Sequence, residues 1–159
     1  MSSNISISEG QNIREDVERL DCESPDRFSI VPAGIQQADS IDELSLQDNS
    51  ITIRKIIERE GVEETPIDEG LDLHTHKHRS AEFVGPTIFF AAHFLPDHWE
   101  EFVTVVESVQ VYLEHLSINE ANMSFVVEKD DGDEVSVEYE GPADELDEVL
   151  DTIEEIVDD

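Results

Sequence analysis

Four side chains that can bind a metal ion recur at every second position between residues 72 and 78. They are Asp72, His74, His76 and His78. Because successive side chains leave a strand on opposite faces, a strand over residues 71–79 would place all four on one face. Carboxylate and imidazole groups at this spacing can bind zinc or a similar divalent metal. The sequence therefore offers one candidate metal site, which would belong to a metal-binding protein or a small metal-dependent hydrolase. The interpretation we favour is the polar face of an exposed strand.

The five residues at the start of this stretch, Asp-Leu-His-Thr-His at 72–76, resemble the opening metal motif of PHP-type phosphoesterases and related amidohydrolases. That resemblance implies a barrel whose first strand carries the H-x-H pair, and such barrels need roughly 200 residues or more. Only about 80 residues follow the motif, and they show no alternation of strands and helices. We interpret the likeness as coincidental, and we predict no catalytic residues and no cofactor, with zinc or a similar divalent metal as the alternative. The sequence leaves enzymatic activity open and favours its absence.

The C-terminal part of the chain gives the clearest structural signal. Residues 123–129 and 134–140 alternate apolar and polar positions with a period of two, which predicts two strands. The turn between them contains Gly132, which can adopt positive φ, so we expect a β-hairpin. Residues 143–157 then carry apolar side chains at spacings of three and four, which predicts a helix. The expected apolar stripe consists of Leu146, Val149, Leu150, Ile153, Ile156 and Val157.

The middle of the chain is less regular. Residues 98–116 carry apolar side chains at helical spacing, which predicts a helix. Gly85-Pro86 precedes the apolar run at 87–95, and a proline is favoured in the first turn of a helix. We therefore expect a helix pair at about 86–116. Residues 28–31 form a short apolar run, which indicates a strand. Residues 50–59 fit either a strand or a helix ended by Gly61, and their β-branched residues favour the strand.

These patterns predict one α+β domain over residues 27–159, in which the ββα unit packs with the helix pair and short N-terminal strands. Residues 1–26 are polar and poor in apolar side chains. We expect them to form a largely mobile arm with a short helix within 12–20.

The strongest property of the whole chain is its acidity. Asp and Glu total 41 against 9 Lys and Arg, which gives a formal net charge of −32 over 159 residues. Such a charge repels itself in dilute buffer and is screened in concentrated salt. The composition resembles that of proteins from salt-accumulating halophilic archaea. It counts against direct binding to nucleic acid or to an anionic membrane.

The cysteine count and the apolar runs bear on location. The single cysteine, Cys22, excludes an intrachain disulfide, and the run at 87–95 is too short to span a bilayer. We therefore expect a cytoplasmic protein.

Our leading hypothesis is a non-enzymatic protein-interaction module of a halophile cytoplasm, which binds a protein partner or a second copy through an open hairpin edge and apolar helix faces. A third hypothesis is an acidic mimic of DNA that inhibits a DNA-binding protein.

Overall fold

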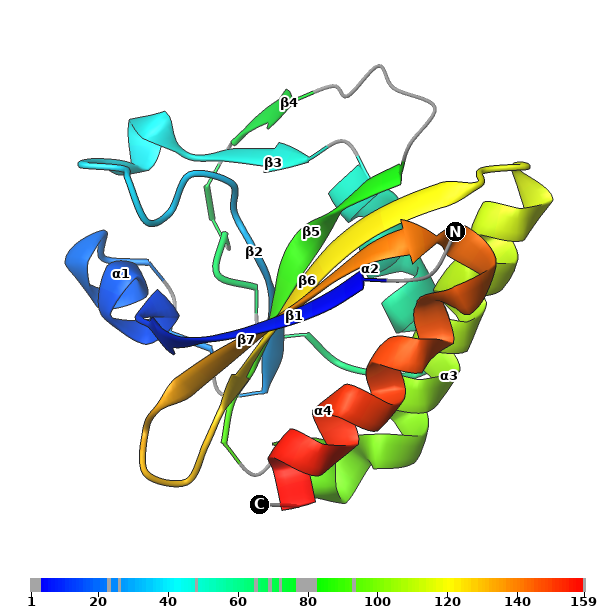
Figure 1. Cartoon of the computed structure of the whole chain (residues 1–159). Helices are drawn as coiled ribbons and strands as arrows, with labels where there is room; N and C mark the ends of the chain where they lie inside the picture. Colours follow the sequence, from blue (N-terminus) through cyan, green and yellow to red (C-terminus); the bar gives the residue numbers. More distant parts are fainter. Residues whose placement is uncertain are drawn as a thin grey trace.

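The computed structural model shows an α+β fold built on a five-stranded sheet (Figure 1). It describes residues 4–22, 24–25, 27–47, 49–64, 66–68, 70–71, 73–76, 83–92 and 94–158. In chain order the elements are β1 (Asn4–Gln11), α1 (Ile13–Arg19), β2 (Phe28–Val31), η1 (Ile41–Glu43), β3 (Ser45–Gln47), α2 (Asn49–Arg59), β4 (His74–His76), β5 (Phe83–Phe90), α3 (Phe94–His115), β6 (Glu120–Glu128), β7 (Glu134–Pro142), η2 (Ala143–Glu148) and α4 (Val149–Asp158).

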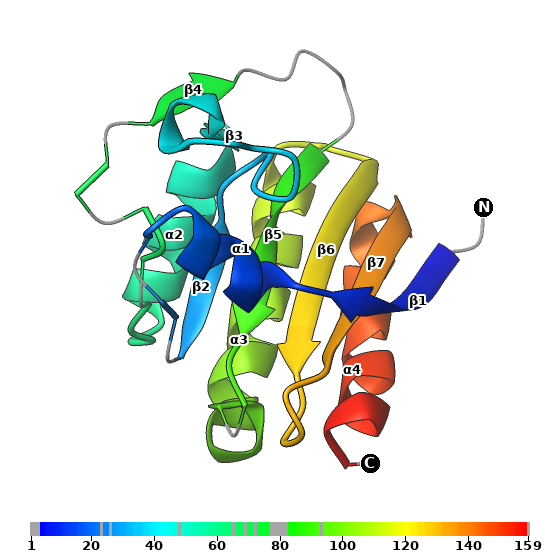
Figure 2. The ribbon, with the colours of Figure 1, turned by 90° about the vertical axis from the view of Figure 1, so that its left-hand side faces the viewer.

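The main sheet has the strand order β1-β7-β6-β5-β2, and β3 and β4 form a separate parallel pair. Strands β5 and β6 are parallel and are joined by α3, whereas the other neighbouring pairs of the main sheet are antiparallel. Figure 2 shows α2, α3 and α4 on one side of this sheet and α1 on the other. The sheet is therefore a middle layer with a full helical layer on one face and partial cover on the second.

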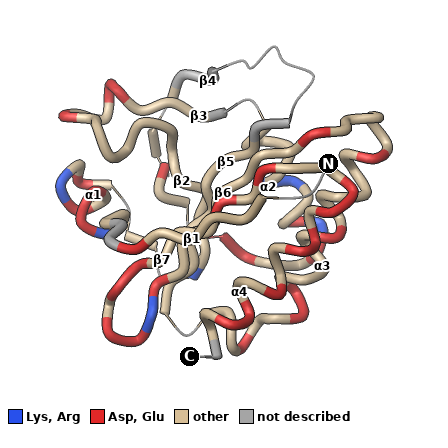
Figure 3. Tube along the Cα trace, viewed as in Figure 1, with Lys and Arg blue, Asp and Glu red and all other residues tan. Residues whose placement is uncertain are grey.

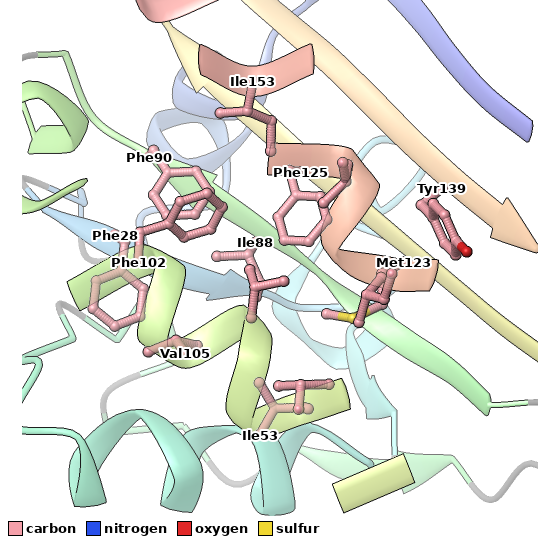
Figure 4. Packing of buried hydrophobic residues seen from close by; sticks show 14 of the residues in the cluster. Phe28, Ile53, Ile88, Phe90, Phe102, Val105, Met123, Phe125, Tyr139 and Ile153 are labelled. Atoms are coloured by element: carbon pink, nitrogen blue, oxygen red, sulfur yellow. The ribbon is translucent and has the colours of Figure 1, made fainter. Parts of the chain in front are cut away.

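The larger core lies between the sheet and the three helices (Figure 4). Its centre is a group of aromatic rings in which Phe90 meets Phe102 edge-on, with 4.9 Å between ring centroids, and Phe125 stacks at 6.4 Å. A smaller core lies on the opposite face, where α1 and the chain after β2 cover Phe89 and Val126. Residues 88–90 thus contribute to both cores, because alternate side chains point to opposite faces.

The predicted ββα unit is confirmed. Strands β6 and β7 form the hairpin, and Gly132 in its turn has φ +93°. The helix differs in detail from the prediction: its first turns are 3-10 helix η2, and only Val149–Asp158 is α-helical. Pro142 is the last strand residue, not the first helical one, since its φ of −58° also fits extended backbone.

Two predictions for the middle of the chain are wrong. The segment after Gly85-Pro86 is not a helix but strand β5, so the expected helix pair at 86–116 is one strand and one helix, α3. A strand covered on both faces reads as a continuous apolar run, which periodicity alone does not distinguish from a buried helix. Residues 50–59 are helix α2, not a strand, because Ile53, Ile56 and Ile57 all pack into the larger core at helical spacing.

The N-terminal residues have defined elements. The short helix predicted within 12–20 is present as α1, and the strand predicted at 28–31 is present as β2. Strand β1 was not expected: it pairs antiparallel with β7 along the edge that we had expected to be open. The segment predicted to be an arm thus supplies an edge strand and the helix that covers the second face of the sheet.

Candidate functional site

A row of polar side chains crosses four strands on the face of the sheet that carries α1. Thr87 on β5 pairs with Ser124 on β6, Ser124 pairs with Glu138 on β7, and Glu138 pairs with Ser6 on β1. Neighbouring residues in the strands, such as Phe125 and Val137, belong to the core on the opposite face. The pairing register therefore brings hydroxyl groups and one carboxylate together from four separate parts of the chain.

A groove with a volume of about 360 Å³ lies between this polar face and the segment that follows β2. Its floor contains Thr87, Ser124, Ser136 and Glu138, and its wall is residues 32–37. The described residues that line it are Ser8, Ile13, Val31, Pro32, Ala33, Gly34, Ile35, Gln36, Gln37, Gly85, Pro86, Thr87, Ser124, Val126, Ser136 and Glu138. The groove is therefore bounded mostly by hydroxyl, amide and aliphatic groups.

The wall of the groove is tied to the rest of the fold at several points. Ala33 and Ser45 exchange backbone hydrogen bonds, and the Ala33 N–H donates to the Ser45 carbonyl at 2.7 Å. Arg19 on α1 donates to the carbonyl of Ile35 at 3.0 Å and also to the carbonyl of Ala38. These contacts hold residues 32–37 beside the sheet, so the groove is preformed.

Glu138 is the single charged residue among the described residues that line the groove. The Ser124 hydroxyl donates a long, exposed hydrogen bond to Glu138 Oε1 at 3.5 Å, which links these two members of the polar row. Elsewhere acidic residues are spread over α1, α4 and the turn between β6 and β7 (Figure 3). The described interior of the groove is thus weakly charged in a chain that is strongly acidic elsewhere.

Strand β1 provides a second candidate site because it is an edge of the main sheet. Its sequence, Asn-Ile-Ser-Ile-Ser-Glu-Gly-Gln, contains one acid and neither lysine nor proline. The side chains of Ser6, Ile7, Ser8 and Glu9 are exposed, and Ile7 is 56% exposed. An edge strand of eight residues without a charge or proline at its centre lacks the features that usually prevent pairing with another chain.

The opposite edge, β2, is short and is blocked. The N–H of Ile30 donates to Glu64 Oε2 at 2.9 Å, so a side chain occupies a position where another strand would pair. Glu64 is held there by Arg54, which donates to Glu64 Oε1 at 2.6 Å and to Asp68 Oδ1 at 2.9 Å. Burial acts to lower the pKa of Arg54, but the hydrogen bonds and charges of these two carboxylates outweigh it and raise the pKa.

The residues predicted to bind a metal are only partly covered by the structure. Asp72 and His78 lie outside the described residues. The backbone of His74 and His76 forms β4, beside Ser45 and Gln47 of β3, and their side chains are not described. The strand predicted for this stretch is thus present at 74–76, and metal binding by the four residues stays a prediction. Among the described side chains, no three His, Cys, Asp or Glu residues gather as a metal site.

No strand was predicted at residues 4–11, and the segment containing Thr87 was predicted to be helical, so neither candidate site was found from the sequence. The alternation of Ile5 and Ile7 with Ser6 and Ser8 was the available signal. The row through Thr87 could not be found without the register of four strands.

None of the helices in the part of the chain that the structure describes is both long and apolar enough to cross a membrane. Compared with known proteins, the chain matches no family model, no curated protein and no solved structure.

Proposed function

We propose that this chain is a non-enzymatic protein-interaction module that associates with a second copy of itself through strand β1. The observation that supports this proposal is the difference between the two edges of the main sheet. The Ile30 N–H of β2 is occupied by Glu64, whereas β1 presents exposed side chains and one charge over eight residues. Backbone hydrogen bonds along an edge strand supply affinity with little demand on side chains.

The sequence of β1 is suited to antiparallel pairing with itself. A two-fold axis at Ile7 places Ile7 opposite the partner's Ile7, and Ser6 opposite the partner's Ser8. Directly opposite residues on antiparallel strands have Cβ atoms about 4.5–5.5 Å apart, so the two isoleucines would bury each other. Both sheets would then continue as one, with a closed two-fold interface.

The acidity of the chain indicates that this association takes place in concentrated salt. Each copy carries a net charge of −32, which opposes contact between two copies at low salt. At 1 M salt the Debye length is about 3 Å, and repulsion between the two surfaces is largely screened. We place the module in the cytoplasm of a salt-accumulating cell, where such screening is permanent.

Sedimentation velocity in molar KCl tests the proposal. Wild type is expected to be a dimer, and Ile7→Lys is expected to be a monomer because lysine at an edge opposes strand pairing. Val111→Lys is the matched control, since Val111 is 63% exposed on α3 and the substitution changes the charge equally. The added positive charge by itself should favour association of an acidic chain. A monomeric wild type, or an Ile7→Lys dimer, would contradict the proposal.

Cross-linking tests the register. In a Cys22→Ser background, Ile7→Cys should form a disulfide-linked dimer on oxidation, because Cβ atoms directly opposite each other are close to disulfide range. Val111→Cys in the same background should stay unlinked. Equal yields from both variants would indicate random collision and not the pairing centred on Ile7.

A further inference from the structure

We propose that the groove beside β1 binds the ammonium group of a small organic cation, with Glu138 as its counter-charge. This inference does not rest on the self-association: Ser8 of the edge strand also lines the groove, but the polar groups used here lie on β5, β6 and β7. The groove volume of about 360 Å³ lies at the lower end of the roughly 300–1,000 Å³ typical of small-ligand pockets.

The polar row explains why an ammonium group would fit. Its hydrogen atoms need several acceptors in different directions, and the floor offers the Thr87 and Ser124 hydroxyl oxygens beside the Glu138 carboxylate. These acceptors come from adjacent strands, whose spacing is about 4.8 Å. A nitrogen between neighbouring strands can therefore reach groups on both. Ile13 and Val126 supply apolar lining for a short methylene chain.

The charge and the polar groups of the groove disfavour the other classes of ligand. Among the lining residues that the structure describes there is no lysine or arginine, and the chain carries −32, so an anion would meet repulsion there. A purely apolar ligand would take the hydroxyl and amide groups out of water without giving them partners. A neutral polyol satisfies the hydroxyls but gains nothing from Glu138.

Three four-carbon probes separate these classes: putrescine, 1,4-butanediol and succinate. Each is titrated into isotopically labelled protein in KCl at constant ionic strength, and amide chemical shifts are followed by NMR. Putrescine is expected to shift the amides of Thr87, Ser124 and Ser136, while the diol and the dianion leave them unchanged. Equal shifts from the diol, or shifts from putrescine spread evenly over the acidic surface, would overturn the proposal.

Glu138→Gln tests the counter-charge, and Glu140→Gln is its matched control. Both residues are exposed on the same face of β7, and only Glu138 lines the groove. An exposed ion pair contributes about 0.2–1 kcal/mol, so the dissociation constant for putrescine should rise roughly 1.4- to fivefold in Glu138→Gln. It should stay unchanged in Glu140→Gln. Equal weakening by both substitutions would mean that putrescine responds to net charge alone.

Discussion

Glu134 at the start of β7 caps helix α1, which lies 121 positions earlier in the chain. Its Oε1 accepts the Ile13 N–H at 2.6 Å, and its Oε2 accepts the Arg14 N–H at 3.2 Å. The N-cap residue Asn12 makes no capping hydrogen bond with its own side chain. Glu134 is only 5% exposed, so a buried carboxylate replaces the local cap and fixes α1 on the sheet.

We expect Glu134→Ala to lower the free energy of unfolding by about 1–3 kcal/mol, because one buried and one partly buried N–H group lose their acceptors. Glu134→Gln should recover part of the loss, since its one amide oxygen can still accept the Ile13 N–H. Urea denaturation at fixed KCl measures both. Glu140→Ala on the exposed face of β7 is the control and should stay within about 0.5 kcal/mol of wild type. Equal effects at 134 and 140 would show that the cap contributes nothing.

A second prediction concerns pH and the neighbouring ion pair. Arg14 donates to both oxygens of Glu128, at 2.7 and 3.0 Å, and the Ala92 N–H donates to Glu128 Oε1 at 2.9 Å. Burial acts to raise the pKa of Glu128, but the hydrogen bonds from Arg14 and Ala92 and the charge of Arg14 outweigh it, so the pKa lies below its ordinary value of 4.5. A lowered carboxyl pKa means stability that is present above the ordinary value and is lost as pH falls through the folded value.

The difference in unfolding free energy between wild type and Glu128→Gln should therefore be largest near pH 7 and shrink as pH falls below about 4.5. Glu134 changes the stability in the opposite direction. Burial raises the pKa of Glu134, so ionising this carboxyl in the folded state lowers the free energy of unfolding as pH rises above 4.5. Glu134 is present in both proteins, so comparing them reduces that background. A difference that stays constant from pH 7 to pH 3 would mean that the charge on Glu128 does not stabilise the fold.

The sequence predicted the local structure well where one periodicity dominated. The β6–β7 hairpin and the helical stripe were correct, although Leu150 is only partly buried while Val149 and Ile153 are fully buried. Prediction failed where tertiary burial removed the periodic signal. The end of β5 is covered on two faces, so residues 88–92 form an uninterrupted apolar run, and α2 has the β-branched composition of a strand.

The candidate sites depend on long-range pairing that no local pattern contains. Ser6 and Glu138 are neighbours because β1 returns to the edge of a hairpin formed more than a hundred residues later. The blocked edge at Ile30 likewise depends on Glu64, which lies 34 positions later and is held by Arg54 of α2. Single-sequence reasoning recognises residue types but cannot assign such partners.

The arginine that supports the blocked edge gives a third prediction. Arg54 makes bidentate hydrogen bonds with both Glu64 and Asp68. A lysine ammonium group cannot form two such bidentate pairs. We expect Arg54→Lys to destabilise the fold by about 1–3 kcal/mol. Amide hydrogen exchange at Ile30 should rise more than exchange at Phe125 in the central strand, since Glu64 loses its anchor.

Arg59→Lys is the matched control, because the Arg59 side chain is 68% exposed and its contact with Glu60 is 3.8 Å long. This exposed pair should contribute at most about 0.5 kcal/mol, and Ile30 should exchange as in wild type. If Arg54→Lys raised exchange equally at Ile30 and Phe125, the substitution would act on global stability only, and the local role of Arg54 at the β2 edge would be rejected.

The last prediction is that folding requires salt. The net charge is −32, and several arginines are already engaged in ion pairs, including Arg14, Arg19 and Arg54. Self-repulsion among the remaining surface carboxylates grows as the Debye length increases from about 3 Å at 1 M to about 10 Å at 0.1 M salt. Circular dichroism during dialysis from molar KCl into dilute buffer should show loss of helical signal.

Glu154 and Glu155 are exposed on α4. Changing both to Gln removes two negative charges, and changing both to Lys shifts the charge by four. The KCl concentration at the unfolding midpoint should fall in that order, because each step reduces the repulsion that salt must screen. An unchanged spectrum across the salt range, or midpoints that do not follow the charge, would remove the physical basis for assigning this protein to a high-salt environment.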